Sequence, residues 1–179
     1  MTGYVALLRG INVGRAKQLP MADLRKLLTG LGYADVKTHL RSGNAVFTST
    51  ETDPATLQSD IEAAISEQLG MDVTCLVRDR HELATVIEAH PLKEVATNGS
   101  RMLVLFLSEP PDPDLLATYD PVALDPDGVR LGERVIYQWC PNGITEAPPV
   151  GAYAEKHLKV AVTARNWNTV TKLAELLDT

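Results

Sequence analysis

Two short turns near the start of the sequence combine arginine with asparagine and glycine, residue types suited to anion binding. They are RGINVG (residues 9–14) and RSGN (residues 41–44). Arginine offers forked donors that match carboxylate and phosphate, and asparagine offers amide donors. Glycine lets backbone N–H groups approach a ligand closely. The candidate ligand-binding residues are therefore Arg9, Asn12, Arg41, Ser42 and Asn44, with further charge from Arg15 and Lys17.

The first 79 residues predict the elements that would bring these turns together. Apolar runs typical of strands occupy residues 3–8, 35–40, 45–49 and 73–78, and helical patterns begin at Pro20 and at Asp53-Pro54. The order βαββαβ is the split-βαβ, or ferredoxin-like, pattern. Its third strand runs antiparallel between the first two, so the end of strand 1 and the strand 2–strand 3 turn share one sheet edge.

A second, smaller α+β half is predicted over residues 80–179. It contains helical patterns at 81–90 and 112–119, strand patterns at 101–108 and 134–140, and two helical stretches, 152–160 and 168–177. The order allows a degraded copy of the first unit, although no residue-level repeat supports one. The expected fold is thus α+β, with a ferredoxin-like half (1–79) packed on the second half (80–179).

The segment TARNWNTVTKL (residues 163–173) is a second candidate site. Asn168 or Thr169 is expected to cap the last helix, whose free N–H groups favour anions. A cap with a buried Trp167 accounts for part of this segment and leaves Arg165 and Asn166 less well explained. These two residues are therefore assigned either a ligand-binding or a domain-docking role.

The charge distribution restricts the possible partners. The net charge is −6, but residues 1–45 hold seven Lys/Arg against two Asp/Glu, and residues 46–155 hold six against nineteen. An acidic chain of this kind argues against sequence-blind duplex binding, which needs a broad basic face. A local basic cleft for a small or precisely placed anion remains compatible with it.

Composition also indicates a cytoplasmic protein without a membrane partner. The longest apolar run, MLVLFL at 102–107, is far shorter than a membrane span, and no signal peptide is recognised. The two cysteines, Cys75 and Cys140, lie in strand-like runs, where free buried thiols are expected.

Standard catalytic and cofactor motifs do not fit this sequence. No phosphate-binding P-loop is present, and HELAT (residues 81–85) lacks the second histidine of a zinc motif. Ser42 could act as a nucleophile only if His39 served as its base, and the motif that usually surrounds such a serine is missing. No metal ion and no cofactor are therefore expected.

Three motifs resemble the bacterial domain-of-unknown-function family 1697: ALLRGINVG (6–14), RSGNAVF (41–47) and TARNWNTVTKL (163–173). The resemblance runs nearly end to end and implies an α+β fold without an established activity. Arg15 replaces a glycine of the family pattern, which adds charge to the loop. The family's serine and lysine before the penultimate helix are also replaced, here by VGAYAEK (150–156).

The favoured function is a binding module for an anionic ligand, such as a nucleotide, a phosphorylated metabolite or a nucleic-acid end. One wall of its cleft would be Arg9, Asn12, Arg41, Ser42 and Asn44, and the other Arg165 with Asn166. An enzyme acting on phosphate or acyl substrates in the same cleft is the first alternative. A protein-interaction module whose basic ends bind an acidic partner is the second. The oligomeric state is left open.

Overall fold

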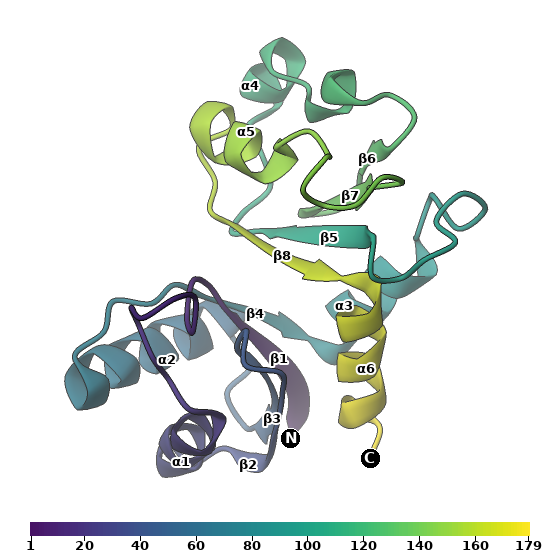
Figure 1. The fold of residues 1–179 in the computed structure, drawn as a ribbon. Helices are drawn as coiled ribbons and strands as arrows, with labels where there is room; N and C mark the ends of the chain where they lie inside the picture. The colour runs from purple at the N-terminus through teal and green to yellow at the C-terminus, as the bar shows by residue number, and fades with distance from the viewer. The chain divides into compact units, whose positions relative to one another are not determined.

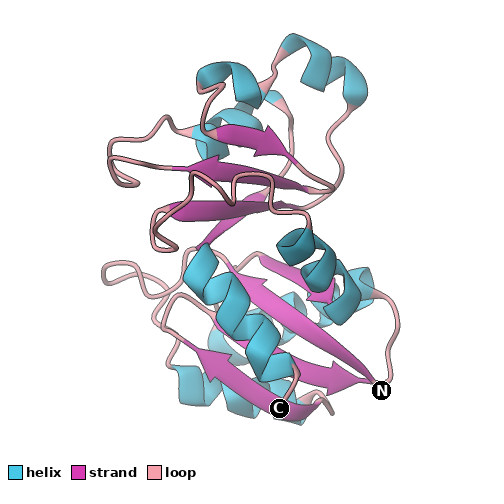
Figure 2. Ribbon diagram, turned by 90° about the vertical axis from the view of Figure 1, so that its right-hand side faces the viewer, coloured by secondary structure: helices cyan, strands magenta, loops and turns pink.

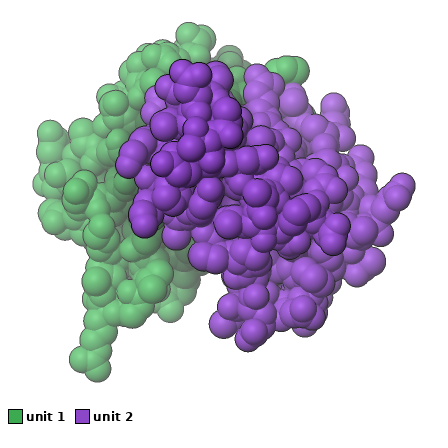
Figure 3. Space-filling view, turned by 90° about the horizontal axis from the view of Figure 1, so that it is seen from above, with its two compact units in different colours: residues 1–84, 172–179 green, residues 85–171 purple.

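A computed structural model describes residues 1–179, which form two compact units. Unit 1 comprises residues 1–84 and 172–179, and unit 2 comprises residues 85–171 (Figure 3). The chain contains both helices and strands (Figure 2), and each unit contains one four-stranded antiparallel sheet. The predicted α+β class is confirmed. No helix is both long enough and apolar enough to cross a membrane.

The sheet of unit 1 has the strand order β2-β3-β1-β4, and every neighbouring pair is antiparallel. Its strands are β1 (Thr2–Leu8), β2 (Ala34–His39), β3 (Asn44–Ser49) and β4 (Cys75–Asp79). As Figure 1 shows, β3 lies between β1 and β2. Because β3 is antiparallel to β1, the C-terminal end of β1 and the β2–β3 turn lie at the same end of the sheet. The name ferredoxin-like stays a prediction for this half.

One face of this sheet is covered by α1 (Met21–Gly30) and α2 (Pro54–Leu69). Side chains alternate along a strand, so every second residue of β1 faces the helices. Tyr4, Ala6 and Leu8 accordingly pack in one apolar core with residues of both helices and of β3 and β4. This burial holds the C-terminal end of β1 in place, and with it the loop that follows.

Local sequence signals alone account for the limits of α2. The Asp53 side chain accepts a hydrogen bond from the Ala55 N–H at 3.1 Å, and Pro54 occupies the first turn. Gly70 ends the helix with φ of 66°, in the left-handed conformation that glycine adopts readily. The predicted start of this helix at Asp53-Pro54 is confirmed.

Unit 2 repeats the strand order of unit 1, with β6-β7-β5-β8 in place of β2-β3-β1-β4. Its sheet is formed by β5 (Met102–Leu107), β6 (Val129–Leu131), β7 (Val135–Trp139) and β8 (Val162–Asn166). The helices are α3 (Arg80–Glu88) and α6 (Trp167–Leu177), each shared with unit 1, and α4 (Pro113–Thr118), a 3-10 turn (Pro121–Leu124) and α5 (Val150–His157).

The repeat extends to individual hydrogen bonds at the sheet edge. In unit 1 the Leu8 N–H donates to the Gly43 carbonyl at 2.9 Å, and in unit 2 the Leu107 N–H donates to the Arg134 carbonyl at 2.9 Å. The end of β5 and the β6–β7 turn therefore correspond to the end of β1 and the β2–β3 turn. The shared topology is evidence that the second unit repeats the first, although their residue identities show no repeat.

The structure differs from the sequence analysis at two points in the C-terminal region. Strand β8 was not predicted, because its sequence VTARN has little apolar alternation, and only its pairing with β5 identifies it. The cap of α6 is neither Asn168 nor Thr169. It is Asn166, whose side-chain oxygen accepts the Thr169 N–H at 2.9 Å.

His90 is a buried residue of unit 2 whose ring is stacked with that of Tyr137 and tilted against that of Trp167. Its ring lies 5.9 Å from that of Tyr137 and 4.4 Å from that of Trp167. Its Nδ1 accepts the Leu92 N–H at 3.2 Å. Burial lowers the pKa of His90, and the positive charge of Lys93 lowers it further.

This lowered pKa predicts a loss of stability in acid. The unfolded chain takes up the proton near pH 6.5 and the folded chain only below that, so stability is retained above pH 6.5 and falls below it. Between pH 7.5 and 5.0, wild type should lose more free energy of unfolding than His90→Asn, which keeps an acceptor but does not titrate. Urea unfolding at both pH values measures this, and equal losses would contradict it.

Candidate functional site

The loop after β1 and the β2–β3 turn lie together at one end of the sheet of unit 1. We call these two segments, residues 9–18 and 40–44, the basic rim. Backbone hydrogen bonds fix its base: the Leu8 N–H donates to the Gly43 carbonyl, and the Arg9 N–H to the Thr74 carbonyl. The first bond links β1 to the turn, and the second links it to the segment before β4. The predicted meeting of the two turns is thus observed within unit 1.

Asn12 holds the two segments of the basic rim together. Its Nδ2 donates to the Arg41 carbonyl at 2.7 Å and to the Leu19 carbonyl at 2.8 Å. Its Oδ1 accepts the Leu19 N–H at 2.7 Å. With φ of 56°, its backbone is left-handed, a conformation that asparagine tolerates better than most residues. Both amide hydrogens are engaged inside the chain, so Asn12 positions the rim.

The turn itself is built by Asn44, Ser42 and Gly43. Asn44 is fully buried, and its Nδ2 donates to the His39 carbonyl at 2.8 Å and to the Ser42 Oγ at 3.0 Å. Gly43 has φ of 95°, and a Cβ at this position would lie 2.8 Å from side-chain atoms of both Leu8 and Ile11. Close packing of the turn on the end of β1 therefore requires glycine here.

Four cationic residues of the basic rim are exposed, and neither of its segments contains an Asp or Glu. The Lys17 side chain is held by a hydrogen bond, since its Nζ donates to the Asp72 carbonyl at 2.7 Å. The Arg41 guanidinium reaches the Gln18 Oε1 at 3.5 Å, and Gln18 in turn donates to the Gly14 carbonyl at 2.7 Å. Sequence reasoning missed Gln18, although its place between Lys17 and the buried Leu19 marks it as part of the loop. The four cations are Arg9, Arg15, Lys17 and Arg41.

The loop also presents backbone donors. The N–H groups of Val13, Gly14 and Arg15 donate to no acceptor within the chain. Gly10 and Gly14 have φ of 70° and 63°, so both adopt the left-handed conformation that glycine tolerates without a steric penalty. Exposed N–H groups beside guanidinium groups are the chemistry that binds phosphate and other oxyanions.

The other two candidates, Arg165 and Asn166, lie at the end of β8 in unit 2. Asn166 caps α6, as described above. Arg165 pairs across the sheet with Val104, and its guanidinium donates to the Ala164 carbonyl at 2.9 Å. The Trp167 N–H donates to the Gly99 carbonyl at 3.1 Å. Structural hydrogen bonds thus occupy much of this cluster.

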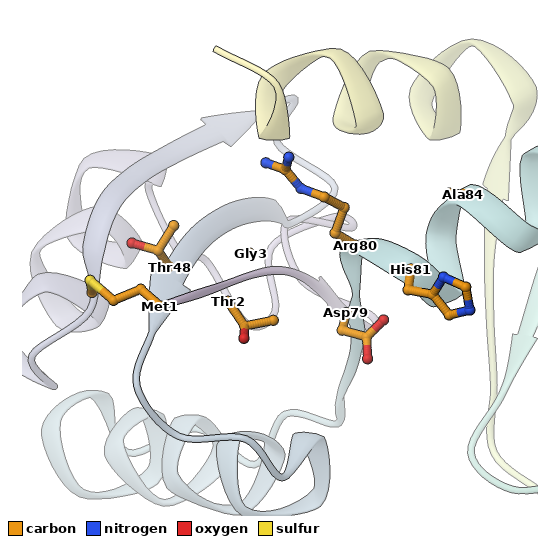
Figure 4. A pocket seen from close by; sticks show the side chains of 8 residues that line it. All are labelled: Met1, Thr2, Gly3, Thr48, Asp79, Arg80, His81 and Ala84. Atoms are coloured by element: carbon orange, nitrogen blue, oxygen red, sulfur yellow. The ribbon is translucent and has the colours of Figure 1, made fainter.

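A hollow of about 640 Å³ lies at the opposite end of β1 from the basic rim (Figure 4). Figure 4 shows Asp79 and Thr2 on one side of β1 and Arg80 pointing to the other, toward the C-terminal end of α6. Asp79 accepts the Glu82 N–H at 2.8 Å, and Arg80 contacts Asp178 at 3.3 Å. These groups cap α3 and hold the C-terminal residues, so the basic rim is the better candidate for a ligand.

The fold and the basic rim define an α+β protein built from two units of like topology, one of which carries a cationic edge. The chain belongs to the family described as "Protein of unknown function (DUF1697)", whose model matches residues 1–137. The resemblance seen in the sequence is confirmed. The matched range includes the whole basic rim and excludes the TARNWNTVTKL segment.

One solved structure similar to this chain is that of the conserved bacterial protein SP0830 from Streptococcus pneumoniae. The two are 26% identical, 98% of each chain is covered, and the TM-score is 0.75. No curated protein matches the chain. The comparisons establish the family and the fold.

Removal of the Asn12 side chain should destabilise unit 1. Asn12→Gly keeps the positive φ and loses three hydrogen bonds, which predicts a loss of about 2 kcal/mol in the free energy of unfolding. Urea denaturation measures the change. The matched control is Asn142→Gly, at an exposed asparagine in a loop of unit 2, for which we expect less than about 1 kcal/mol. Equal losses in the two variants would contradict the positioning role.

Two glycines of the basic rim provide a matched pair for testing the packing of the turn. Gly14 also has a positive φ, but no atom lies within 4 Å of a Cβ added there. Gly14→Ala should cost about 1 kcal/mol for the backbone alone. Gly43→Ala should cost at least about 2 kcal/mol, because its methyl group also collides with Leu8 and Ile11. Chemical denaturation that ranks the two variants in the reverse order would disprove this packing.

Proposed function

We propose that this protein is an anion-binding module and that its binding site is the basic rim of unit 1. The observation that carries the proposal is the convergence of two segments that bear exposed cations and contain no Asp or Glu. Asn12 joins the segments across 29 residues of sequence, which fixes Arg41 beside the loop that bears Arg15. Such a preassembled set of cations lowers the entropic cost of binding an anion.

The corresponding edge of unit 2 supports a functional origin for this charge. The loop after β5 and the β6–β7 turn carry Glu109, Asp112 and Glu133, and the one arginine there, Arg134, donates to the Ser108 carbonyl at 3.1 Å. The same topology is therefore compatible with an acidic edge. Because the turn does not need cations in order to fold, their presence in unit 1 is better explained by a ligand.

The proposal assigns two kinds of role to the candidate residues. Asn12, Ser42 and Asn44 position the basic rim, since their side chains form hydrogen bonds within it. The arginines contact the ligand, together with the N–H groups of the loop. The ligand classes expected from the sequence, namely a nucleotide, a phosphorylated metabolite or a nucleic-acid end, all carry a phosphate that this set of donors fits.

The alternatives stay hypotheses without an observation that favours them. The Ser42 Oγ accepts a hydrogen bond from Asn44, which supports a structural role for this hydroxyl. Experiments can distinguish small-ligand binding from the two alternatives, which are a reaction in the same site and binding of an acidic protein. Turnover abolished by Arg9→Ala in a folded protein would favour the enzyme, and capture of a salt-sensitive partner would favour the interaction module.

Binding can be tested with inorganic phosphate, pyrophosphate, AMP and glycerol phosphate by thermal shift and calorimetry. We expect at least one of these probes to raise the melting temperature at micromolar to millimolar concentration. Arg15→Ala and Arg41→Ala should each weaken binding roughly tenfold, since a hydrogen bond to a charged group contributes about 1.5–3 kcal/mol. Higher salt should weaken it too.

The control is Lys26→Ala, which removes one exposed positive charge of unit 1 from α1, outside the basic rim. It should bind the same probe with unchanged affinity. Absence of binding by every probe would overturn the proposal. So would an equal loss of affinity in Lys26→Ala and Arg41→Ala, because the effect would then reflect net charge.

A further inference from the structure

We infer that the anion bound at the basic rim is a phosphate carried on an aliphatic chain. This inference rests on the proposed function and narrows its ligand to one chemical class. The rim presents two large apolar side chains to solvent: Val13 is 72% exposed, and Leu40 is 55% exposed. Val13 directly follows Asn12 in the chain and Leu40 directly precedes Arg41, and a hydrogen bond joins the Asn12 side chain to the Arg41 carbonyl. Apolar surface and phosphate-binding donors are thus adjacent.

The backbone conformation and the exposure of Leu40 do not favour leucine. Its φ is 62°, in the left-handed region, where a residue with a Cβ loses about 1–2 kcal/mol and where glycine or asparagine is favoured. Its exposed side chain adds little to the core. A single exposed apolar residue is ordinary, but an exposed leucine in an unfavourable backbone conformation indicates a contact made outside the folded chain.

Val13 combines a backbone donor for phosphate and an exposed apolar side chain in one residue. Its N–H donates to no acceptor in the chain, and its side chain is the most exposed of the large apolar residues after Met1. If the N–H groups of Val13, Gly14 and Arg15 bind a phosphate, the group esterified to that phosphate lies beside the apolar Val13 side chain. Chain carbons placed there would cover Val13 and Leu40 and exclude water from both.

Residue composition distinguishes an aliphatic chain from a nucleobase. Residues 9–18 and 40–44 contain no Phe, Tyr, Trp or His. Bases bind most readily by stacking on aromatic rings, which this rim does not offer. Branched aliphatic side chains, in contrast, offer only a hydrophobic contact, whose strength grows with the length of chain buried.

The test compares ethyl phosphate with hexyl phosphate by calorimetry, with inorganic phosphate as the reference probe. Hexyl phosphate should bind about tenfold more tightly than ethyl phosphate, which corresponds to burial of about two methylene groups. The variant Leu40→Asn should reduce this difference and leave the affinity for inorganic phosphate unchanged. Asparagine suits the left-handed backbone at position 40, so this variant should fold. The matched control is Ile144→Ser, which alters an exposed aliphatic residue of unit 2.

The outcomes separate this inference from the proposed function. If inorganic phosphate binds and hexyl phosphate binds no better than ethyl phosphate, the inference is overturned and the proposed function stands. If none of the three binds, both fail. Vesicles of neutral lipid with and without phosphatidic acid distinguish the source: binding to hexyl phosphate alone indicates a soluble ligand, and binding also to phosphatidic acid vesicles indicates a membrane lipid.

Discussion

The side-chain amide of Asn12 is the interaction on which the basic rim depends. One planar group satisfies two carbonyls and one N–H, and these belong to segments far apart in the sequence. Asparagine combines the required properties, because it has donors and an acceptor on a short side chain and tolerates a positive φ. Aspartate would lack the donors, and glutamine would lack the same tolerance of the left-handed region. The loop after β1 thereby gains a defined place beside the turn, and the arginines in both segments gain a common location.

The repeat of topology in the two units shows what the sheet does and does not impose. Each unit places the end of its first strand beside the turn between its second and third strands, and the same backbone hydrogen bond closes both edges. The side chains at the two edges differ in charge. The scaffold therefore specifies a location for a site, and the residues placed there specify its chemistry.

The candidate residues illustrate how far sequence reasoning reached. It selected the correct pair of turns, because βαββαβ order with turn signals restricts which loops can meet. It did not separate exposed side chains from those that support the fold: Asn12 and Asn44 are polar residues in glycine-containing turns, and nothing in their type tells whether the amide faces solvent or backbone. Asn166 was misread for the same reason, since the start of α6 depends on where β8 ends.

By itself, the sequence determined the features whose partners lie within a few residues. These include the α+β class, the limits of α2 with its aspartate cap and terminal glycine, and the presence of a turn at 41–44. Only the tertiary structure decided the existence of β8, the partners of Asn12 and the packing of Leu8 against Gly43. Local signals act through neighbouring backbone groups and steric preference, so they can be recognised in one segment. Contacts between distant segments form only when the whole chain closes around a core, and what is packed beside a residue then decides whether its side chain supports the fold or faces solvent.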